Sequence, residues 1–444
     1  EYFSFAKDKA CLDVIIHQGN DFQITNEFWK EIQKMTKNFL REGEFVTFPG
    51  YEWSGNTGLG GDRNVIFYNE GEKIRRSSHA LVSDCEDLKS DCNNTEDLFK
   101  SLKGTKTIIF AHVGGRYADI NSHATKLERS IEIHSAWGTF EWLLQDAIKL
   151  GYRVGIVCNS DGHKGRPGAS YPGASMFGAY GGLTCLLSSQ LTREKIWESM
   201  LSRRHYGTTG NRMFLDVKAT LQSPAKRYIE DPRIDKNNAE ITKIGIMGDI
   251  IQTKESNVLL EVEVIASAPI EKLEIRNGIK IVETVRPYKE NELGNRIRVI
   301  WAGAEYRGRG RETVWDGSAS FYDNQILSFK PINMYNIEKK IRNPSPNLLE
   351  WESITTGGFS GFDCILKDPF LGKIKINTSL LNFEIPIKDI GFIDKFKNAG
   401  GLDRHVRLVR LPHKNPHFNL SIERNILLNP QKDNPLYVCI TQED

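Results

Sequence analysis

Five short apolar runs in the first half of the chain each end at side chains that can bind a metal ion. The run 154–157 leads to Asp161 and His163, which are spaced i, i+2 around Gly162. Carboxylate oxygen and imidazole nitrogen are both good ligands for zinc, manganese or iron. A single Asp-x-His is a weak signal, so the recurrence is what predicts a metal site. In the other four runs, residues 45–48 lead to Glu52, 107–111 to His112, 130–133 to His134, and 13–16 to His17 and Asn20.

Residues 1–215 alternate apolar runs with amphipathic segments, and this alternation predicts a parallel sheet, open or closed into a barrel. Three threonines stand where helices are expected to begin, and their side chains are suited to N-capping. In α/β barrels, functional groups gather at the C-terminal ends of the strands, which is where the candidate ligands occur. The three candidate caps are Thr25, Thr95 and Thr192.

The pattern changes after residue 215. Residues 216–245 are interpreted as a linker, and helical periodicity is nearly absent from residues 246–444. Alternating apolar and polar segments separated by turn residues predict an antiparallel β-sandwich there. This second domain could bind glycans or a partner, or it could only support the first domain.

Composition excludes several classes of function. The 444-residue chain has a net charge of +2 and no long block of Lys and Arg, which argues against nucleic-acid binding. No run of 18 apolar residues is present, so no membrane span is expected. The seven cysteines contain no CxxC pair, so they predict no zinc ribbon. The chain starts at Glu1, and we expect the natural N-terminus to lie upstream, which leaves the compartment and the oligomeric state open.

The ligand types point to metal-assisted hydrolysis. A carboxylate such as Glu52 can bridge two divalent ions, which bring bound water to a pKa of about 7. Asp161 would then guide the attack, and His163 could protonate the leaving group. Arginines beside the motifs could clamp a small anionic substrate, although a solvated or structural arginine fits the same pattern. These arginines are Arg63, Arg116 and Arg166.

Several motifs resemble one known family. They are GYEWSG at 50–55, AHVGG at 111–115, EIHS at 132–135, GTFEW at 138–142 and SDGHKGRPG at 160–168. Together they resemble the PHP (polymerase and histidinol phosphatase) superfamily, above all its branch called domain of unknown function family 3604. Residues 268–278 and 437–444 look like the β-domain of the same branch. The resemblance implies a distorted (β/α)7 barrel of PHP type that holds two or three divalent metal ions and hydrolyses phosphate esters.

The resemblance also implies roles for individual residues. Glu52 would be the bridging carboxylate, His112 and His134 would bind a second metal, Asp161 the first metal and His163 the third. Two departures bear on this assignment. The His-x-His of the family's first strand would precede residue 1, and Gln18-Gly19-Asn20 replaces the family's Thr-Asp-His. Asn20 is a poor ligand and His17 could substitute or only pack, so two metal ions are expected.

Other interpretations of the same residues stay open. Binuclear sites also serve amidohydrolases, which cleave C–N or C–O bonds. The altered position of Asn20 is compatible with a non-catalytic binding protein that has a degenerate metal site. Each candidate ligand could instead be a buried, hydrogen-bonded structural residue. Glu132 and Glu141 could orient the metal-bound histidines, or they could face water.

Overall fold

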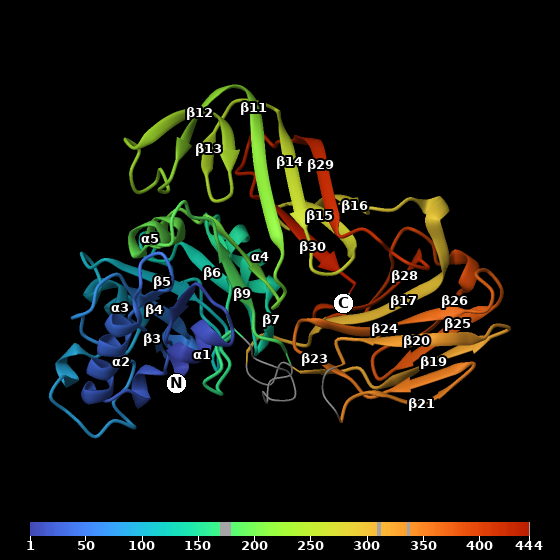
Figure 1. The fold of residues 1–444 in the computed structure, drawn as a ribbon, viewed down its shortest axis with the longest axis horizontal. Coiled ribbons are helices and arrows are strands. Elements are labelled where there is room, and N and C mark those ends of the chain that lie inside the picture. The colour runs from blue at the N-terminus through green and yellow to red at the C-terminus, as the bar shows by residue number, and fades with distance from the viewer. Residues whose placement is uncertain (169–178, 309–311, 335–337, 444) are drawn as a thin grey trace.

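The computed structural model describes residues 1–168, 179–308, 312–334 and 338–443. Figure 1 shows an α/β region near the N-terminus, a first pair of β-sheets beside it, and a second pair at the far end of the molecule. The candidate ligands of the sequence analysis lie in the α/β region. The strand order and strand directions of the sheet in this region therefore determine which candidate ligands lie close together.

A mixed six-stranded sheet forms the centre of the α/β region. Its strands are β3 (Gly50–Trp53), β4 (Arg63–Phe67), β5 (Thr107–Ala111), β6 (Ser130–Ser135), β7 (Gly138–Thr139) and β8 (Gly155–Cys158). The order is β3-β4-β5-β6-β7, and β8 also pairs with β6. β6 runs parallel to β5 and β8, whereas β3–β4, β4–β5 and β6–β7 are antiparallel. Two separate pairs are β1 (Val14–Ile16) with β2 (Val46–Phe48), and β9 (Leu183–Leu186) with β10 (His205–Thr208).

The prediction of a distorted (β/α)7 barrel is wrong. The protein is mostly β-sheet, with 43% strand and 14% helix, and the described residues form no closed barrel. In a (β/α) barrel successive strands run parallel, and each connection needs a crossover of roughly a dozen residues or more. The loop 54–62 is too short for such a crossover, so the chain reverses and β4 pairs antiparallel with β3.

Helices and apolar side chains cover both faces of the mixed sheet. The helices are α1 (Tyr2–Asp8), α2 (Asn26–Phe39), α3 (Thr95–Ser101), α4 (Glu141–Lys149) and α5 (Arg193–Leu201). On one face, Val65 of β4 belongs to a core that includes Trp29 of α2. On the opposite face, Ile66 belongs to a core that includes Trp197 of α5. The sheet is therefore buried on both sides, and polar groups within it must find partners there.

Two of the three predicted helix caps are confirmed. The Oγ1 atom of Thr25 accepts a hydrogen bond from the Phe28 amide at 3.1 Å, and Thr192 caps α5 in the same way. At α3 the cap is Asn94, one residue before the predicted Thr95. Local sequence thus places these helix starts to within one residue, because a cap needs only its own side chain and the following backbone amides.

The region expected to be a linker, residues 216–245, contains most of β11 and β12. These strands belong to a sheet of order β12-β11-β14-β29, in which β13 also pairs with β11. A second sheet, β16-β15-β30, packs against it through a shared apolar core. The strands are β11 (Phe214–Tyr228), β12 (Ala239–Ile246), β13 (Ile250–Gln252), β14 (Asn257–Ile265), β15 (Ile270–Asn277), β16 (Lys280–Val285), β29 (Asn419–Leu427) and β30 (Leu436–Gln442).

A second sandwich follows. The β-rich fold fits the predicted antiparallel β-sandwich, with two pairs of sheets where one was expected. Its sheets have the orders β20-β24-β17-β28-β27 and β21-β22-β19-β25-β26. Trp301 and Trp351 stack at its centre with ring centroids 4.6 Å apart. The strands are β17 (Leu293–Ala304), β18 (Thr313–Val314), β19 (Gly317–Tyr322), β20 (Ile326–Ile332), β21 (Ile341–Ser345), β22 (Leu348–Trp351), β23 (Ile354–Thr355), β24 (Phe359–Leu366), β25 (Lys373–Thr378), β26 (Asn382–Pro386), β27 (Lys395–Asn398) and β28 (Leu402–Pro412).

A buried ionic network joins the two sandwiches. Glu271 of β15 accepts hydrogen bonds from Arg298 of β17 at 2.7 Å and from Arg407 of β28 at 2.6 Å. Burial alone would raise the pKa of Glu271, but the charges of Arg407 and Arg298 outweigh it and hold the pKa well below its usual value. The Glu271 carboxylate is therefore charged and fully paired where the sandwiches meet.

The second sandwich also contacts the α/β region through a close approach of two backbones. The amide of Thr139 in β7 donates to the carbonyl of Thr356 at 3.1 Å. Gly357 has a φ of +88°, and a Cβ atom there would lie 1.8 Å from the Thr139 carbonyl oxygen. Only glycine fits this position, since any side chain would push β7 and the second sandwich apart.

We expect Glu271→Gln to lower the free energy of unfolding by up to about 3–5 kcal/mol at pH 7, because it removes one carboxylate charge from a buried network in which Arg298 then keeps Asp363 and Arg407 keeps Asp394 as partners. The depressed pKa of Glu271 stabilises the folded state above the unfolded pKa of about 4.3, and this contribution is lost as the pH falls. The difference from wild type should therefore narrow below about pH 4. Denaturant titrations at several pH values measure both effects.

The matched control for this prediction is Glu384→Gln, which removes a solvent-exposed partner of Lys373. Its unfolding curve should stay close to that of wild type, because exposed ion pairs contribute little. Equal effects of the two substitutions would contradict a special contribution from the buried network.

Gly357→Ala should lower the midpoint of unfolding, since a left-handed backbone alone costs alanine about 1–2 kcal/mol and the clash with Thr139 adds to this. Gly391→Ala is the control, because no heavy atom lies within 4 Å of a Cβ built there. Denaturant unfolding of both variants compares them directly. A midpoint for Gly357→Ala equal to that of Gly391→Ala would show that the two regions are not held together at this point.

Candidate metal centre

Strand register places several polar side chains on one face of the mixed sheet. Glu52 on β3 is directly opposite Asn64 on β4, and Asn64 is opposite Phe110 on β5. Directly paired residues point to the same face, as do residues two apart along a strand. His112 follows Phe110 by two positions and therefore reaches the same face as Glu52.

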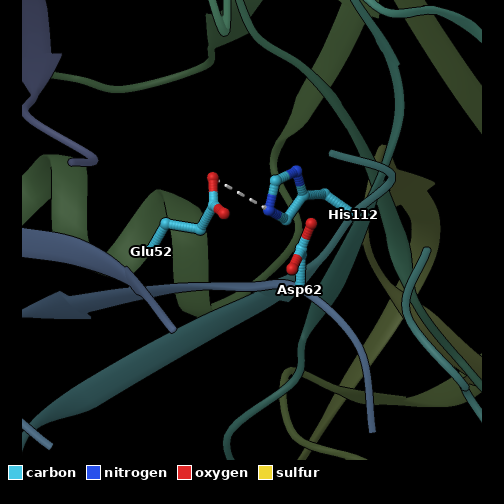
Figure 2. Close-up of side chains that lie close together, drawn as sticks. All are labelled: Glu52, Asp62 and His112. Carbon is cyan, nitrogen blue, oxygen red and sulfur yellow. Dashed lines mark ion pairs between the residues drawn. The ribbon is translucent and has the colours of Figure 1, made fainter. Parts of the chain in front are cut away.

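Glu52, Asp62 and His112 meet at one point, as Figure 2 shows. One potential ligand atom from each lies within 4.8 Å of the other two, and all three residues are buried. Glu52 Oε2 is 3.7 Å from His112 Nε2. Two carboxylates and an imidazole are a donor set that suits zinc, manganese or iron.

Asp62 is the residue that sequence reasoning missed. It immediately precedes β4, and in an antiparallel pair the residue before one strand lies beside the end of its partner. The sequence signal was available in Gly60 and Gly61, which favour a tight turn just before this carboxylate. A parallel arrangement of β3 and β4, as predicted, would have carried Asp62 away from Glu52.

The electrostatics of the cluster favour a bound cation. Burial raises the pKa of Glu52 well above its usual value, and the nearby charges of Asp62 and Asp161 raise it further. Burial also raises the pKa of Asp62, although Arg116 opposes this shift. A divalent ion would relieve the repulsion between the carboxylates and replace the water they lose on burial. The donor set therefore fits a metal ion.

Arg116 lies beside the cluster, as the sequence analysis expected. Its Nε atom donates to Asp62 Oδ1 at 2.8 Å and its backbone amide donates to Asp62 Oδ2 at 2.9 Å. Its Nη2 atom is 3.8 Å from Glu52 Oε1, and the side chain remains 29% exposed. Each Asp62 oxygen still has a second lone pair for a metal, and the exposed end of Arg116 can face an anion.

Asn20 and His17 have structural partners. The Nδ2 atom of Asn20 donates to Glu52 Oε1 at 2.7 Å and to Ser54 Oγ at 2.9 Å, so Asn20 orients the Glu52 carboxylate. His17 Nδ1 accepts from the Gly19 amide at 3.3 Å, and its ring packs edge-on against Tyr2. Burial lowers the pKa of His17. Neither residue belongs to the cluster around Glu52.

His134 is held by two hydrogen bonds at its ring. Nε2 donates to the Tyr180 carbonyl at 2.9 Å, so Nδ1 carries the lone pair and accepts from Thr139 Oγ1 at 2.8 Å. Burial lowers its pKa to about 4, which keeps the ring neutral. The structure therefore gives both ring nitrogens partners outside the cluster. Glu141, which was considered as an orienting residue, pairs with Arg276 at 2.9 Å instead.

Asp161 and His163 follow β8 near the cluster. The charge of Asp161 contributes to the raised pKa of Glu52, whereas Asp161 does not belong to the group of three converging residues that includes Glu52. His163 Nδ1 donates to the Asp161 carbonyl at 3.0 Å and lies 3.6 Å from Asp161 Oδ1. Asp161 has a φ of +42°, a left-handed conformation that is uncommon for a residue with a side chain. The side chain of His163 is 48% exposed and is therefore accessible from solvent.

Arg63 has structural partners, which is the alternative that the sequence pattern left open for this residue. The residue is fully buried and pairs with Glu128 at 2.9 Å. Its other guanidinium hydrogens go to the carbonyl oxygens of Gly60, Gly61, Asp119 and Ser122. All five donors are used, so Arg63 fixes the loops around β4. Arg166, by contrast, is exposed in the loop after His163.

A second group of possible ligands lies in the segment between β4 and α3. His79, Asp84 and Asp87 also approach one another closely. Here Arg76 donates to Asp87 at 2.6 Å, and His79 is within hydrogen-bond reach of Asp87 and Asp91. The residues of this second group are only partly buried, whereas Glu52, Asp62 and His112 are all buried, so the latter cluster is the stronger candidate for a metal.

Comparison with known proteins agrees with part of the expected resemblance. Residues 2–113, a range that includes Glu52, Asp62 and His112, match the family described as Protein of unknown function (DUF3604). An uncharacterized protein of Chlamydia pneumoniae is 23% identical over an alignment of 222 residues, and the alignment covers 45% of this chain. The aligned part spans only 34% of that relative. No solved structure matches the chain. Within the described residues, the helices are too short or too polar to cross a bilayer.

Elemental analysis after incubation with zinc or manganese and desalting should find at least one equivalent of metal in the wild-type protein. Glu52→Gln and His112→Ala should lose this ion, because each removes one of three converging ligands. His134→Gln should keep it, because both nitrogens of His134 are bonded elsewhere. Retention of the ion by Glu52→Gln, or its loss from His134→Gln alone, would contradict this assignment of ligands.

Proposed function

We propose that this protein is a metal-dependent hydrolase of PHP type that acts on a small anionic substrate, a phosphate ester in the first instance. The observation that carries the proposal is the buried meeting point of Glu52, Asp62 and His112. Buried carboxylates without full compensation by cationic side chains are typical of functional sites rather than of structural ones. The sequence motifs that resemble the PHP superfamily support the same assignment.

One divalent ion is proposed at Glu52, Asp62 and His112, and a second between Glu52 and Asp161. The second position is supported by the charge of Asp161, which raises the pKa of Glu52. Zinc, manganese and iron all suit oxygen and imidazole ligands. When bound, such ions lower the pKa of water to about 7 and polarise a phosphoryl or carbonyl oxygen.

The remaining chemistry falls to side chains at the edge of the cluster. Arg116 presents an exposed guanidinium beside Glu52 and Asp62, where it would bind and orient an anionic group. Arg166 is exposed three residues after His163 and would offer a second cationic group to the same substrate. His163 Nδ1 is fixed by the Asp161 carbonyl, so its Nε2 atom is the one that would carry a proton to the leaving group.

A non-catalytic binding protein with a degenerate metal site is the second candidate. The observation in its favour is Asn20, which donates to Glu52 at 2.7 Å from the position where the family pattern has a ligand histidine. An amide donor of this kind holds the carboxylate in place and leaves one fewer side chain to bind metal. Under this alternative, the protein binds metal or anion without turnover.

The proposal is tested by assaying metal-loaded protein on p-nitrophenyl phosphate, bis(p-nitrophenyl) phosphate and a matched p-nitroanilide. Hydrolysis of a phosphate ester should depend on zinc, manganese or iron, and Glu52→Gln and His112→Ala should each reduce kcat/KM by at least about 100-fold. His134→Gln should retain metal-dependent turnover. Cleavage of the anilide alone would favour an amidohydrolase, and metal binding without turnover of any substrate would favour the binding protein.

A further inference from the structure

Glu132 is a buried carboxylate directly behind the candidate metal ligand His112. It lies on β6, on the same face as His112, because the paired residues Phe110 and Ser130 are each two positions away from these side chains. Glu132 Oε1 is 3.7 Å from His112 Nδ1, while Glu52 Oε2 is 3.7 Å from His112 Nε2. The imidazole ring thus lies between two carboxylates, one at each nitrogen.

Two amide side chains fix the orientation of Glu132. Asn159 and Asn64 both donate to its Oε2 atom, Asn64 at 3.4 Å. Among the residues that the structure describes, Glu132 Oε1 has no hydrogen-bond partner, and the side chain is only 1% exposed. Burying a carboxylate oxygen without a hydrogen bond costs free energy. We therefore expect its orientation toward the imidazole to have a structural or functional cause.

The two sides of the His112 ring differ in what they offer a cation. On the Nε2 side lies Glu52, which forms a close group of possible ligands together with Asp62 and His112. On the Nδ1 side lies Glu132, whose second oxygen is already bound by two amides. A metal ion therefore belongs on the Nε2 side, and the Nδ1 side is suited to a hydrogen bond.

We propose that Glu132 is a positioning residue that accepts a hydrogen bond from Nδ1–H of His112 and so directs Nε2 at the metal. This inference rests on the proposed metal-dependent function. Metal-binding histidines commonly donate their other ring N–H to a carboxylate, which fixes the ring tautomer and increases ligand basicity. The separation of 3.7 Å exceeds a hydrogen bond, and a cation held at Nε2 would make Nδ1–H a stronger donor to Glu132.

A purely structural role for Glu132 predicts different behaviour. Glu128 gives a matched comparison, because it is equally buried in the same region and pairs with Arg63 at 2.9 Å. Removing the charge of Glu128 affects packing around Arg63 without touching His112. If Glu132 has only a structural role, substitutions of Glu132 and Glu128 should affect metal affinity equally. If Glu132 positions His112, only the substitution of Glu132 should lower metal affinity.

The test measures zinc affinity by competition with a chelator for wild type, Glu132→Gln, Glu132→Asp and Glu128→Gln. Glu132→Gln should bind zinc 10–100-fold more weakly than wild type at unchanged stoichiometry, and Glu132→Asp should recover part of the loss. Glu128→Gln should lower stability but keep wild-type affinity. Nitrogen-15 NMR of the histidine rings should find Nδ1 of His112 protonated in zinc-bound wild type and a mixed tautomer in metal-free Glu132→Gln.

Failure of this inference can be told apart from failure of the proposed function. If wild-type protein binds no zinc, manganese or iron, the proposed function is overturned and this inference with it. If wild type binds zinc and Glu52→Gln does not, but Glu132→Gln keeps wild-type affinity and tautomer, only the role of Glu132 is overturned. Should Glu132→Gln fail to fold, wild-type affinity in the more conservative Glu132→Asp and in Asn64→Ala would overturn it.

Discussion

The candidate centre depends on the pairing register of β3, β4, β5 and β6. Direct opposition of Glu52 to Asn64 and of Asn64 to Phe110 places a row of polar side chains on one buried face. A shift of one residue in any of these pairs would move a member of the row to the opposite face, into the apolar core against α2 and α3. The antiparallel turn before β4 adds Asp62 to the same point. Pairing geometry, more than any single contact, assembles the ligands.

Buried carboxylates in this protein fall into two groups with opposite electrostatic character. Glu271 and Glu128 face arginine side chains, which hold their pKa values below the usual range against the effect of burial. Burial instead dominates at Glu52, and it raises the pKa of Glu132 to about 8. In the first group, the arginine partners already compensate the buried negative charge. In the second group, the buried negative charge of Glu52 and Glu132 is compensated only in part. A bound cation would supply the missing positive charge.

Sequence reasoning succeeded where the determining physics is local. The helix caps Thr25 and Thr192 were predictable because capping involves neighbouring residues only. Glu52 and His112 were found as candidate ligands at strand ends, but apolar runs carry no information about strand direction, so the parallel barrel was wrong. For the same reason, Asp62 was not identified as a candidate ligand from the sequence. The buried state of Arg63, with all five donors engaged, also arises from loops distant in sequence.

The sequence by itself determined the alternation of elements in residues 1–215, the β-rich second half, and a set of polar residues at the ends of apolar strands. Those features follow from side-chain periodicity and local hydrogen bonding, which any stretch of chain carries with it. Only the tertiary structure decided which of these residues meet. Strand direction and register brought Glu52, Asp62 and His112 together, and they directed His134 to Thr139 and Tyr180 instead. Such long-range choices depend on how separate segments bury their surfaces against one another, and no single segment encodes them.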